Sequence, residues 1–404
     1  MIKHVVTWRF KDDVDEGTRQ AILAEVQAFP SHFPQMHNFV LGENISSREQ
    51  RMTHTFMIEF EDQDALMAYL GSERHETFVR ERWRPVVDSQ AIAALEADGL
   101  PAGMEKLVSD RPRGPYGFAF ARIAVPDLAA SIEFYTYHVG LQLEGHDETY
   151  AQLRANLSHH DIELVADPSR TEHFVETLGF SVESQEVLED LRARLVADGR
   201  EIGELHPRTK AACQDGFSVV DPNGQTLEFV RDFHVYAEPP LTEWRPIDIV
   251  HPFLSTPYYQ ESQRFYCDVL GFLRSDVIVA DGFGASTFLR CEDRYHHSLA
   301  LRQDSKYYVA HIAFQMKSLD HVMRGRTKAV YKKINIPSDI VNHSASTSIA
   351  FYMYEAQHGP RIELMDRHRV FTPVEHETHK ERYMSADPRN IDVWRAASDD
   401  WERF

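Results

Sequence analysis

The feature that most constrains the fold of this chain is an internal repeat between residues 118 and 368. An apolar strand, a helix containing Phe-Tyr and a turn with glycine occupy residues 120–143 and return at residues 249–273. A second pattern, which ends at Glu228, returns and ends at Glu363. Each unit is typical of a strand, a helix and several further strands. Four such units, arranged as two pairs, predict two similar α+β domains.

The two pairs differ at three equivalent strand positions. In the second pair these positions hold His251, His311 and Glu363. In the first pair they hold a set that cannot bind a divalent metal, namely Arg122, Thr177 and Glu228. Two neutral imidazoles and one carboxylate leave other coordination positions open, which is the ligand set of non-haem Fe(II) enzymes that bind substrate and O2 together. The sequence therefore predicts a metal site in the second pair. Glu228 lacks partners, so a structural role is expected for it.

Composition shifts divide the chain into five segments. Residues 1–100 read as strand, helix, strand, strand, helix, an α+β pattern, and residues 101–116 form a polar linker containing proline and glycine. The metal-free pair then occupies residues 117–236 and the metal-binding pair residues 245–368. The polar tail, residues 369–404, is dotted with aromatic residues, and we expect it to pack on the last domain and over its pocket.

Charge and composition exclude several classes of partner. The formal net charge is −20, with 43 basic and 63 acidic residues, so neither nucleic acid nor an anionic membrane is expected to bind. No apolar run is long enough to span a bilayer, and the N-terminus has no signal-peptide layout. Three widely spaced cysteines suit a reducing compartment. A cytoplasmic protein without membrane or nucleic-acid partners is the expectation.

The repeated units, with the phrase Phe265-Tyr-Cys-Asp-Val-Leu-Gly-Phe272, resemble the vicinal oxygen chelate superfamily. The second pair is similar to the catalytic domain of type I extradiol ring-cleaving dioxygenases. The resemblance implies four βαβββ modules, of which the first pair is inert and the second binds Fe(II), with Mn(II) as the alternative. It also implies that the substrates are a small aromatic diol and O2.

The resemblance extends to residues beyond the metal ligands. His297, within Arg294-Tyr-His-His-Ser-Leu-Ala-Leu301, matches the histidine that serves those enzymes as acid and base. His343 and Tyr352 match the residues that donate hydrogen bonds to the substrate. His296 is expected either behind the site or facing solvent.

Two departures from the family pattern leave the strand register near Tyr352 open. Ala356 stands where the family has proline, and the turn before Glu363 is one residue longer. Tyr354 is therefore the alternative to Tyr352 as the tyrosine of the site.

The first 100 residues resemble the stress-responsive dimeric α/β-barrel family, through Lys3-His-Val-Val6 and the segment from Asp64 to His75. In that family two ferredoxin-like subunits close a barrel between them, which implies a homodimer or a higher homo-oligomer. Some members are cyclases or decarboxylases with a Tyr and a His at the spacing of Tyr69 and His75. We expect these two residues to serve the fold, and catalysis there is the alternative.

These observations favour an Fe(II)-dependent extradiol dioxygenase that inserts both atoms of O2 into a catechol with meta ring cleavage, a catechol 2,3-type reaction. Hydroquinone-cleaving dioxygenases share the ligand set and stay open as an alternative. Metal-dependent isomerases or lyases of the superfamily usually use two glutamates as well as histidines, and no second carboxylate is evident here. A non-catalytic protein that binds aromatic ligands would not need His297 or His343.

Overall fold

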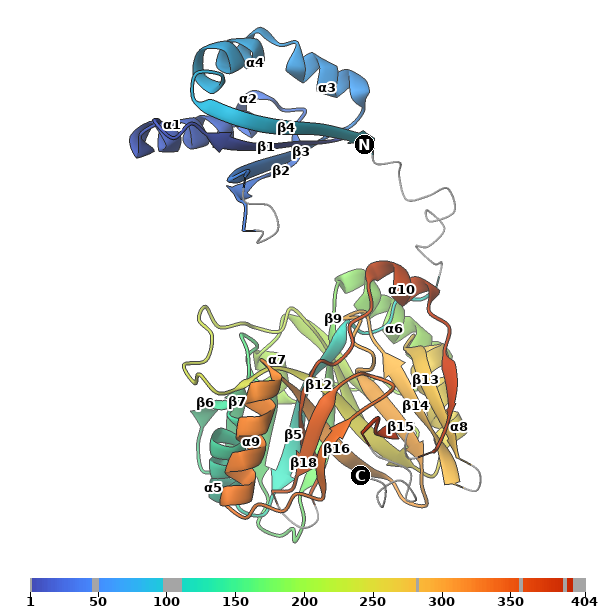
Figure 1. The fold of residues 1–404 in the computed structure, drawn as a ribbon. Helices are drawn as coiled ribbons and strands as arrows, with labels where there is room; N and C mark the ends of the chain where they lie inside the picture. Colours follow the sequence, from blue (N-terminus) through green and yellow to red (C-terminus); the bar gives the residue numbers. More distant parts are fainter. Residues whose placement is uncertain are drawn as a thin grey trace. The chain divides into compact units, whose positions relative to one another are not determined.

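The computed structural model describes residues 2–45, 51–96, 111–280, 283–355, 359–387 and 391–394. The chain divides into two compact units, Met1–Val108 and Ser109–Phe404 (Figure 1). Most of the segment expected to be a linker, residues 101–110, lies outside the described residues, as does Ala356. Among the described residues, no helix has both the length and the apolar character needed to cross a membrane.

The first unit is a four-stranded antiparallel sheet, in the order β2-β3-β1-β4, with helices on one face (Figure 1). Its strands are β1 (Ile2–Phe10), β2 (His37–Glu43), β3 (His54–Phe60) and β4 (Val87–Glu96). Its helices are α1 (Glu16–Gln27), α2 (Phe29–His32), α3 (Gln63–Leu70), α4 (Glu73–Phe78) and the π-helical turn η1 (Val79–Trp83). The α+β expectation is confirmed, but the fourth strand was missed, because its Ser-Gln-Ala-Ile-Ala-Ala-Leu-Glu run is richer in helix-forming than in β-forming residues.

Alternation along β1 builds the core of this unit. The buried side chains of β1 point towards the helices: Ile2, His4, Val6, Trp8 and Phe10. Tyr69 joins them with 1% of its surface exposed, and Phe29, Phe33 and Phe60 surround its ring. His75 instead lines a cavity among the helices. Tyr69 therefore packs as a core residue, in line with the expected role in the fold.

The second unit contains two mixed sheets that repeat one another. The first has the order β10-β11-β9-β5-β8-β7-β6, and the second β17-β18-β19-β16-β12-β15-β14-β13-β20. Seven strands correspond one to one between the sheets, and the second sheet adds β17 and β20 at its edges. In each half the same two strand pairs are parallel, β5 with β8 and β9 with β11, then β12 with β15 and β16 with β19. This match confirms the repeat predicted from the sequence.

The bounds of the elements in the second unit are as follows. The first sheet contains β5 (Gly117–Val125), β6 (Gln142–His146), β7 (Tyr150–Arg154), β8 (Ile162–Ala166), β9 (Phe174–Val182), β10 (Asp215–Val220) and β11 (Thr226–Arg231). The second contains β12 (Pro246–Thr256), β13 (Leu273–Ala280), β14 (Phe283–Arg290), β15 (Leu299–Gln303), β16 (Tyr308–Met316), β17 (Ser338–Asn342), β18 (Ile349–Met353), β19 (Arg361–Asp366) and β20 (Arg382–Ser385). The helices are α5 (Leu128–Glu133), η3 (Phe134–Val139), α6 (Gln185–Ala197), α7 (Pro207–Ala211), α8 (Tyr259–Arg264), η4 (Phe265–Val269), α9 (Leu319–Tyr331) and α10 (Pro373–Thr378).

Strand register brings the predicted site positions onto neighbouring strands. Phe253 of β12 pairs with His311 of β16, and Glu363 of β19 pairs with the residue two positions beyond His311. Tyr352 of β18 pairs with Glu363. The register of β12 shifts just before His251 and just after Phe253. Such irregularities re-aim side chains, so residues from four strands can converge on one place.

The first sheet lacks both histidines, but the predicted equivalence of Arg122 with His251 is wrong by two residues. The matching registers of β5 with β9 and of β12 with β16 place Phe120 at the position of His251 and Arg122 at the position of Phe253.

The buried guanidinium of Arg122 donates to Glu163 over 2.6 Å and to Thr177 over 3.1 Å, and it lies 3.7 Å from Glu228. The expectation that Glu228 lacks partners is wrong, because its carboxylate also accepts hydrogen bonds of 2.7 Å from the Thr209 hydroxyl and from a backbone N–H. Arg208 lies 3.0 Å from Glu163 as a second cation, so fixed positive charges accompany both buried carboxylates in this half.

Asp161, between β7 and β8, is another buried carboxyl group in the metal-free half, and among the described residues it forms no ion pair with a cationic side chain. Its side chain is fully buried, one oxygen accepts from the Ala155 N–H over 2.6 Å, and the other has no partner within the described structure. Burial raises the pKa of Asp161 to about 8. Because the folded pKa lies above the unfolded value, the stability that the protonated group contributes is complete at low pH and is lost as pH rises towards 8.

Asp161→Asn cannot ionise, so we expect its melting temperature to rise above that of the wild type, by a margin that grows between pH 5 and pH 8. Thermal unfolding followed by circular dichroism measures the difference. The exposed Glu148→Gln is the matched control and should show no such trend. A margin that is the same at every pH would contradict the raised pKa.

Candidate metal centre

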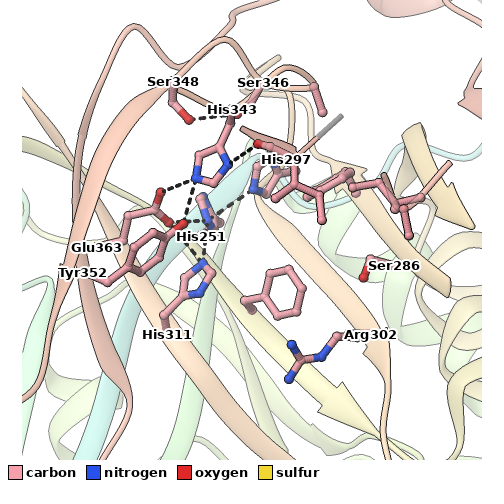
Figure 2. Close-up of a pocket in the computed structure, with 16 residues that line it drawn as sticks. His251, Ser286, His297, Arg302, His311, His343, Ser346, Ser348, Tyr352 and Glu363 are labelled. Atoms are coloured by element: carbon pink, nitrogen blue, oxygen red, sulfur yellow. Dashed lines mark hydrogen bonds and ion pairs between the residues drawn. The ribbon is translucent and has the colours of Figure 1, made fainter. Parts of the chain in front are cut away.

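Three side chains from three strands meet at one buried point (Figure 2). His251 Nε2 lies 3.2 Å from His311 Nε2 and 3.4 Å from Glu363 Oε2, and His311 Nε2 lies 3.1 Å from the same oxygen. No more than 5% of any of these residues is exposed. They come from β12, β16 and β19, so the structure brings together the three residues predicted from the repeat.

The spacing of these donor atoms fits a metal ion. A transition metal with bonds of about 2.1 Å to ligands at right angles holds adjacent donor atoms about 3 Å apart. Burial lowers the pKa of His311 to about 4, which leaves its imidazole neutral at neutral pH. Burial alone would raise the pKa of Glu363, but hydrogen bonds from neighbouring histidines hold it well below its ordinary value. The neutral imidazole of His311 and the carboxylate of Glu363 are therefore ready to bind a divalent cation, with His251 Nε2 as the third donor atom.

Two other groups of side chains in the described structure have comparable spacing. His251 also lies close to His297 and His368, and Glu292 lies close to His376 and Glu377. The second group already surrounds a cation, because the guanidinium of Arg111 contacts all three of its members, one carboxylate at 2.6 Å. The three-histidine group offers no carboxylate to neutralise a buried dication. The group containing Glu363 is therefore the better metal site.

The candidate centre opens into a cavity of about 240 Å³. Its walls are mostly apolar, formed by Phe253, Ile278, Phe288, Ala345, Ala386 and Ile391. Arg302 also lines the cavity, and Figure 2 shows it on the far side from Glu363. Glu363 is the only carboxylate among the described lining residues. The cavity therefore suits an apolar ring with polar groups directed at the three donors.

His297, His343 and Tyr352 line the same cavity. His297 Nε2 lies 3.2 Å from His251 Nε2, and burial first, then nearby histidines, lower its pKa. His343 Nε2 lies 2.8 Å from the Tyr352 hydroxyl. Although burial opposes it, the interaction with Glu363 raises the pKa of His343. These three residues share the cavity with the candidate ligands, and their roles stay predictions.

Tyr354, the alternative to Tyr352, does not line this cavity. It lines a neighbouring polar cavity together with Tyr307, Tyr308 and Arg361. Tyr352 instead packs its ring 5.3 Å from that of His311. The structure thus favours Tyr352 as the tyrosine beside the candidate metal centre.

Several residues at the centre carry no motif that could have identified them. His368 follows β19 and packs against His297 with ring centroids 4.6 Å apart, and buried Asp276 lies on β13. His296 is fully buried, so solvent exposure is excluded for it. The C-terminal extension contributes Ala386 and Ile391 to the cavity wall, as expected for a segment over the pocket. Only the order of the strands brings these residues together.

Comparison with known families agrees with this architecture. Residues 2–96 match the stress responsive A/B barrel domain. Residues 117–229 and 248–364 match the glyoxalase/bleomycin resistance protein/dioxygenase superfamily. Since these two stretches make up more than half of the chain, the chain belongs to this superfamily, and it carries an N-terminal domain of the A/B barrel family.

One characterised relative and two solved structures are similar to this chain. An iron-dependent extradiol dioxygenase from Rhodococcus jostii is 27% identical over 260 residues, which cover 58% of this chain and 84% of the relative. The Mn(II)-bound glyoxalase from Novosphingobium aromaticivorans superposes with a TM-score of 0.60 at 24% identity, over 70% of this chain and 91% of that one. A variant of homoprotocatechuate 2,3-dioxygenase from Brevibacterium fuscum gives 0.63 at 20% identity, over 72% and 83%. The two solved structures share the fold but have different chemistries, so the fold alone does not select the reaction.

Replacement of His311 by Gln is expected to weaken Fe(II) binding by at least the roughly 10- to 100-fold that follows loss of a supporting partner in metal sites, because one of three donors is removed. Iron content after anaerobic reconstitution measures this. His368→Gln is the matched control and should retain iron. Loss of iron in His368→Gln with retention in His311→Gln would move the metal to the three-histidine group.

Proposed function

We propose that this chain is an Fe(II)-dependent extradiol dioxygenase that cleaves a catechol-type ring next to its two hydroxyls and incorporates both atoms of O2. The observation that carries the proposal is the convergence of His251, His311 and Glu363, with donor atoms 3.1 to 3.4 Å apart, beside a cavity that also exposes His297. The similarity to an iron-dependent extradiol dioxygenase supports the same reaction.

The division of labour between metal and protein follows from the geometry. Fe(II) held by two imidazoles and a carboxylate supplies open coordination positions for a diol and O2 and the redox chemistry that joins them. His297 has Nε2 beside the ligand His251 and can accept a hydroxyl proton from the substrate and return it later. In its protonated form His343, with Tyr352, can donate hydrogen bonds to a ring oxygen. Phe253 and Phe288 provide apolar walls for the ring.

Other functions and another metal ion are alternatives to this proposal. A para-diol could be held by the same donors, so hydroquinone cleavage is the closest competitor, and Mn(II) could replace Fe(II) at this ligand set. An isomerase or lyase would need a second carboxylate at the metal, and the described lining residues offer Glu363 alone. A passive binding protein would have no need for an imidazole beside the metal ligands.

The reaction is tested by oxygen consumption. With the anaerobically reconstituted Fe(II) protein, catechols are expected to consume one O2 per ring cleaved and to give a product that absorbs in the visible. An oxygen electrode and absorbance spectra across a panel of substituted catechols and hydroquinones measure this. Turnover of hydroquinones alone would select the competitor, and absence of O2 uptake with every diol at full iron loading would reject the proposal.

We further propose that the N-terminal unit pairs with a second copy of the chain. The sheet face opposite the helices carries an apolar row that crosses all four strands, Val40, Met57, Val5 and Ala93, extended by Leu95, which is 56% exposed. An uncovered apolar face of this kind favours association. The match to the A/B barrel family supports closure of the face by an identical subunit.

Val5→Lys, at the centre of this row, is expected to shift the protein from dimer to monomer, because an unpaired ammonium would be buried between the two sheets. Sedimentation velocity on the full-length chain measures the change. Ala21→Lys, on the exposed side of α1, is the control and should leave the assembly intact. Dimers that persist in Val5→Lys would place the contact elsewhere.

A further inference from the structure

A line of hydrogen-bonded side chains runs from the cavity to the C-terminal extension behind His297. His297 Nδ1 lies 3.0 Å from His296 Nδ1, and His296 Nε2 lies 2.8 Å from Asp276 Oδ2. His296 and Asp276 are fully buried, so no water competes for these bonds. The line ends at Arg382 of β20, whose Nε donates to Asp276 Oδ1 over 2.7 Å and whose Nη2 donates to Oδ2 over 2.5 Å.

This line dictates which ring nitrogens carry hydrogens. Asp276 is a carboxylate because the hydrogen bonds from Arg382 and His296 outweigh burial and hold its pKa at about 2. Burial lowers the pKa of His296, so its ring is neutral and has one N–H. That N–H must be on Nε2, since a carboxylate only accepts. Nδ1 of His296 is then an acceptor, and it takes the N–H on Nδ1 of His297.

With its hydrogen on Nδ1, a neutral His297 has a free lone pair on Nε2. Nε2 is also the atom that lies 3.2 Å from the Nε2 of the candidate ligand His251. The lone pair is therefore on the nitrogen that a substrate hydroxyl beside the metal would reach. The opposite arrangement would present an N–H there, and the ring could not take up a proton.

The metal-free half provides an internal comparison. It retains the histidine pair, with His159 Nδ1 and His160 Nδ1 2.9 Å apart. The pairing of β6 with β7 follows the same register as the pairing of β13 with β14, including a shift one residue before Gly145 and Asp276. Gly145 therefore stands at the position of Asp276. The carboxylate is thus present only in the half that has the metal donors.

We propose that Asp276 and His296 are positioning residues that hold His297 with Nε2 free to accept the substrate's proton, and that Arg382 of the C-terminal extension orients Asp276 for this task. The proposal rests on the proposed ring-cleavage function for its consequence in catalysis. The arrangement of hydrogens itself can be observed without turnover.

The extension acts on the second cavity imidazole in the same way. The Ile391 carbonyl accepts from His343 Nδ1 over 3.2 Å, and Val393 and Asp392 bond to the backbone of Asn342. Strand β20 adds to the sheet beside β13 with Arg382 opposite Asp276. Both imidazoles that face the substrate therefore depend on this extension for their orientation.

Asp276→Asn tests the proposal because it should exchange donor and acceptor in each hydrogen bond from residue 276 through His296 to His297. Arg382 donates twice to the Oδ1 position, through Nε and its backbone N–H, and once to the Oδ2 position, through Nη2. The asparagine oxygen should therefore lie at the position with two donors, which directs the amide nitrogen to His296. His296 would then accept on Nε2 and donate from Nδ1, and His297 would have its hydrogen on Nε2. We expect kcat for catechol to fall roughly a hundredfold, with iron content and KM little changed.

Three comparisons separate this role from structural support. The loss should be much smaller for 4-nitrocatechol, which is largely ionised before binding, and Asp276→Glu should recover part of the activity on catechol. Asp248→Asn, at a half-buried carboxylate of the same domain outside this line, should keep the wild-type kcat. An equal loss on both substrates, or loss of iron, would overturn the proposal.

The hydrogen positions are read directly from ¹⁵N NMR of the full-length, histidine-labelled chain loaded with diamagnetic Zn(II). The His297 ring, assigned with a His297→Gln variant, should have an unprotonated Nε2 in the wild type and a protonated Nε2 in Asp276→Asn. A protonated Nε2 in the wild type would refute the proposal. If the wild type cleaves no diol, the proposed function fails, and this spectrum still decides the arrangement of hydrogens.

Discussion

A buried carboxylate that needs a cation is the constraint on which this structure depends. Moving an ionised carboxylate out of water is costly unless a positive partner accompanies it. The two halves of the second unit meet this need differently on one scaffold. In the first, Arg122 brings a fixed positive charge to Glu163 and Glu228. In the second, Glu363 faces the imidazoles of His251 and His311 in place of a fixed cation, an arrangement that suits an exchangeable metal ion.

The residues around Glu363 form a cavity that could hold a substrate beside the candidate metal ligands. Apolar side chains form part of the cavity wall, so charges and dipoles beside them interact more strongly than they would in water. The imidazoles of His297 and His343 each have a hydrogen-bond partner for Nδ1, which leaves Nε2 as the nitrogen nearer the candidate ligands. Metal sites commonly orient their histidines in this way, through outer hydrogen bonds. Here the same device orients the imidazoles that would move protons.

Much of the architecture could be predicted because local sequence patterns determine it. Alternating strands, glycine turns and the duplicated phrase around Phe265 predicted the α+β class and the paired modules, and both are confirmed. The strand β4 was missed because tertiary pairing overrode the helical preference of its alanines. The ligand roles of His251, His311 and Glu363 stay predictions, although the register does bring these residues together.

The sequence alone determined the repeat and the absence of the histidine pair of ligands from its first half, since the repeated phrases can be aligned by spacing. Only the strand register showed that Phe120, and not Arg122, stands at the position of His251. Only the tertiary structure decided which side chains stand behind the site. Asp276 lies on β13, 20 residues before His296 of the loop that precedes β15, and Arg382 lies 106 residues after Asp276 in an extension without periodicity. Their contacts arise from strand pairing across the sheet, a relation that leaves no spacing signal along the chain. The choice between Tyr352 and Tyr354 depended on register for the same reason.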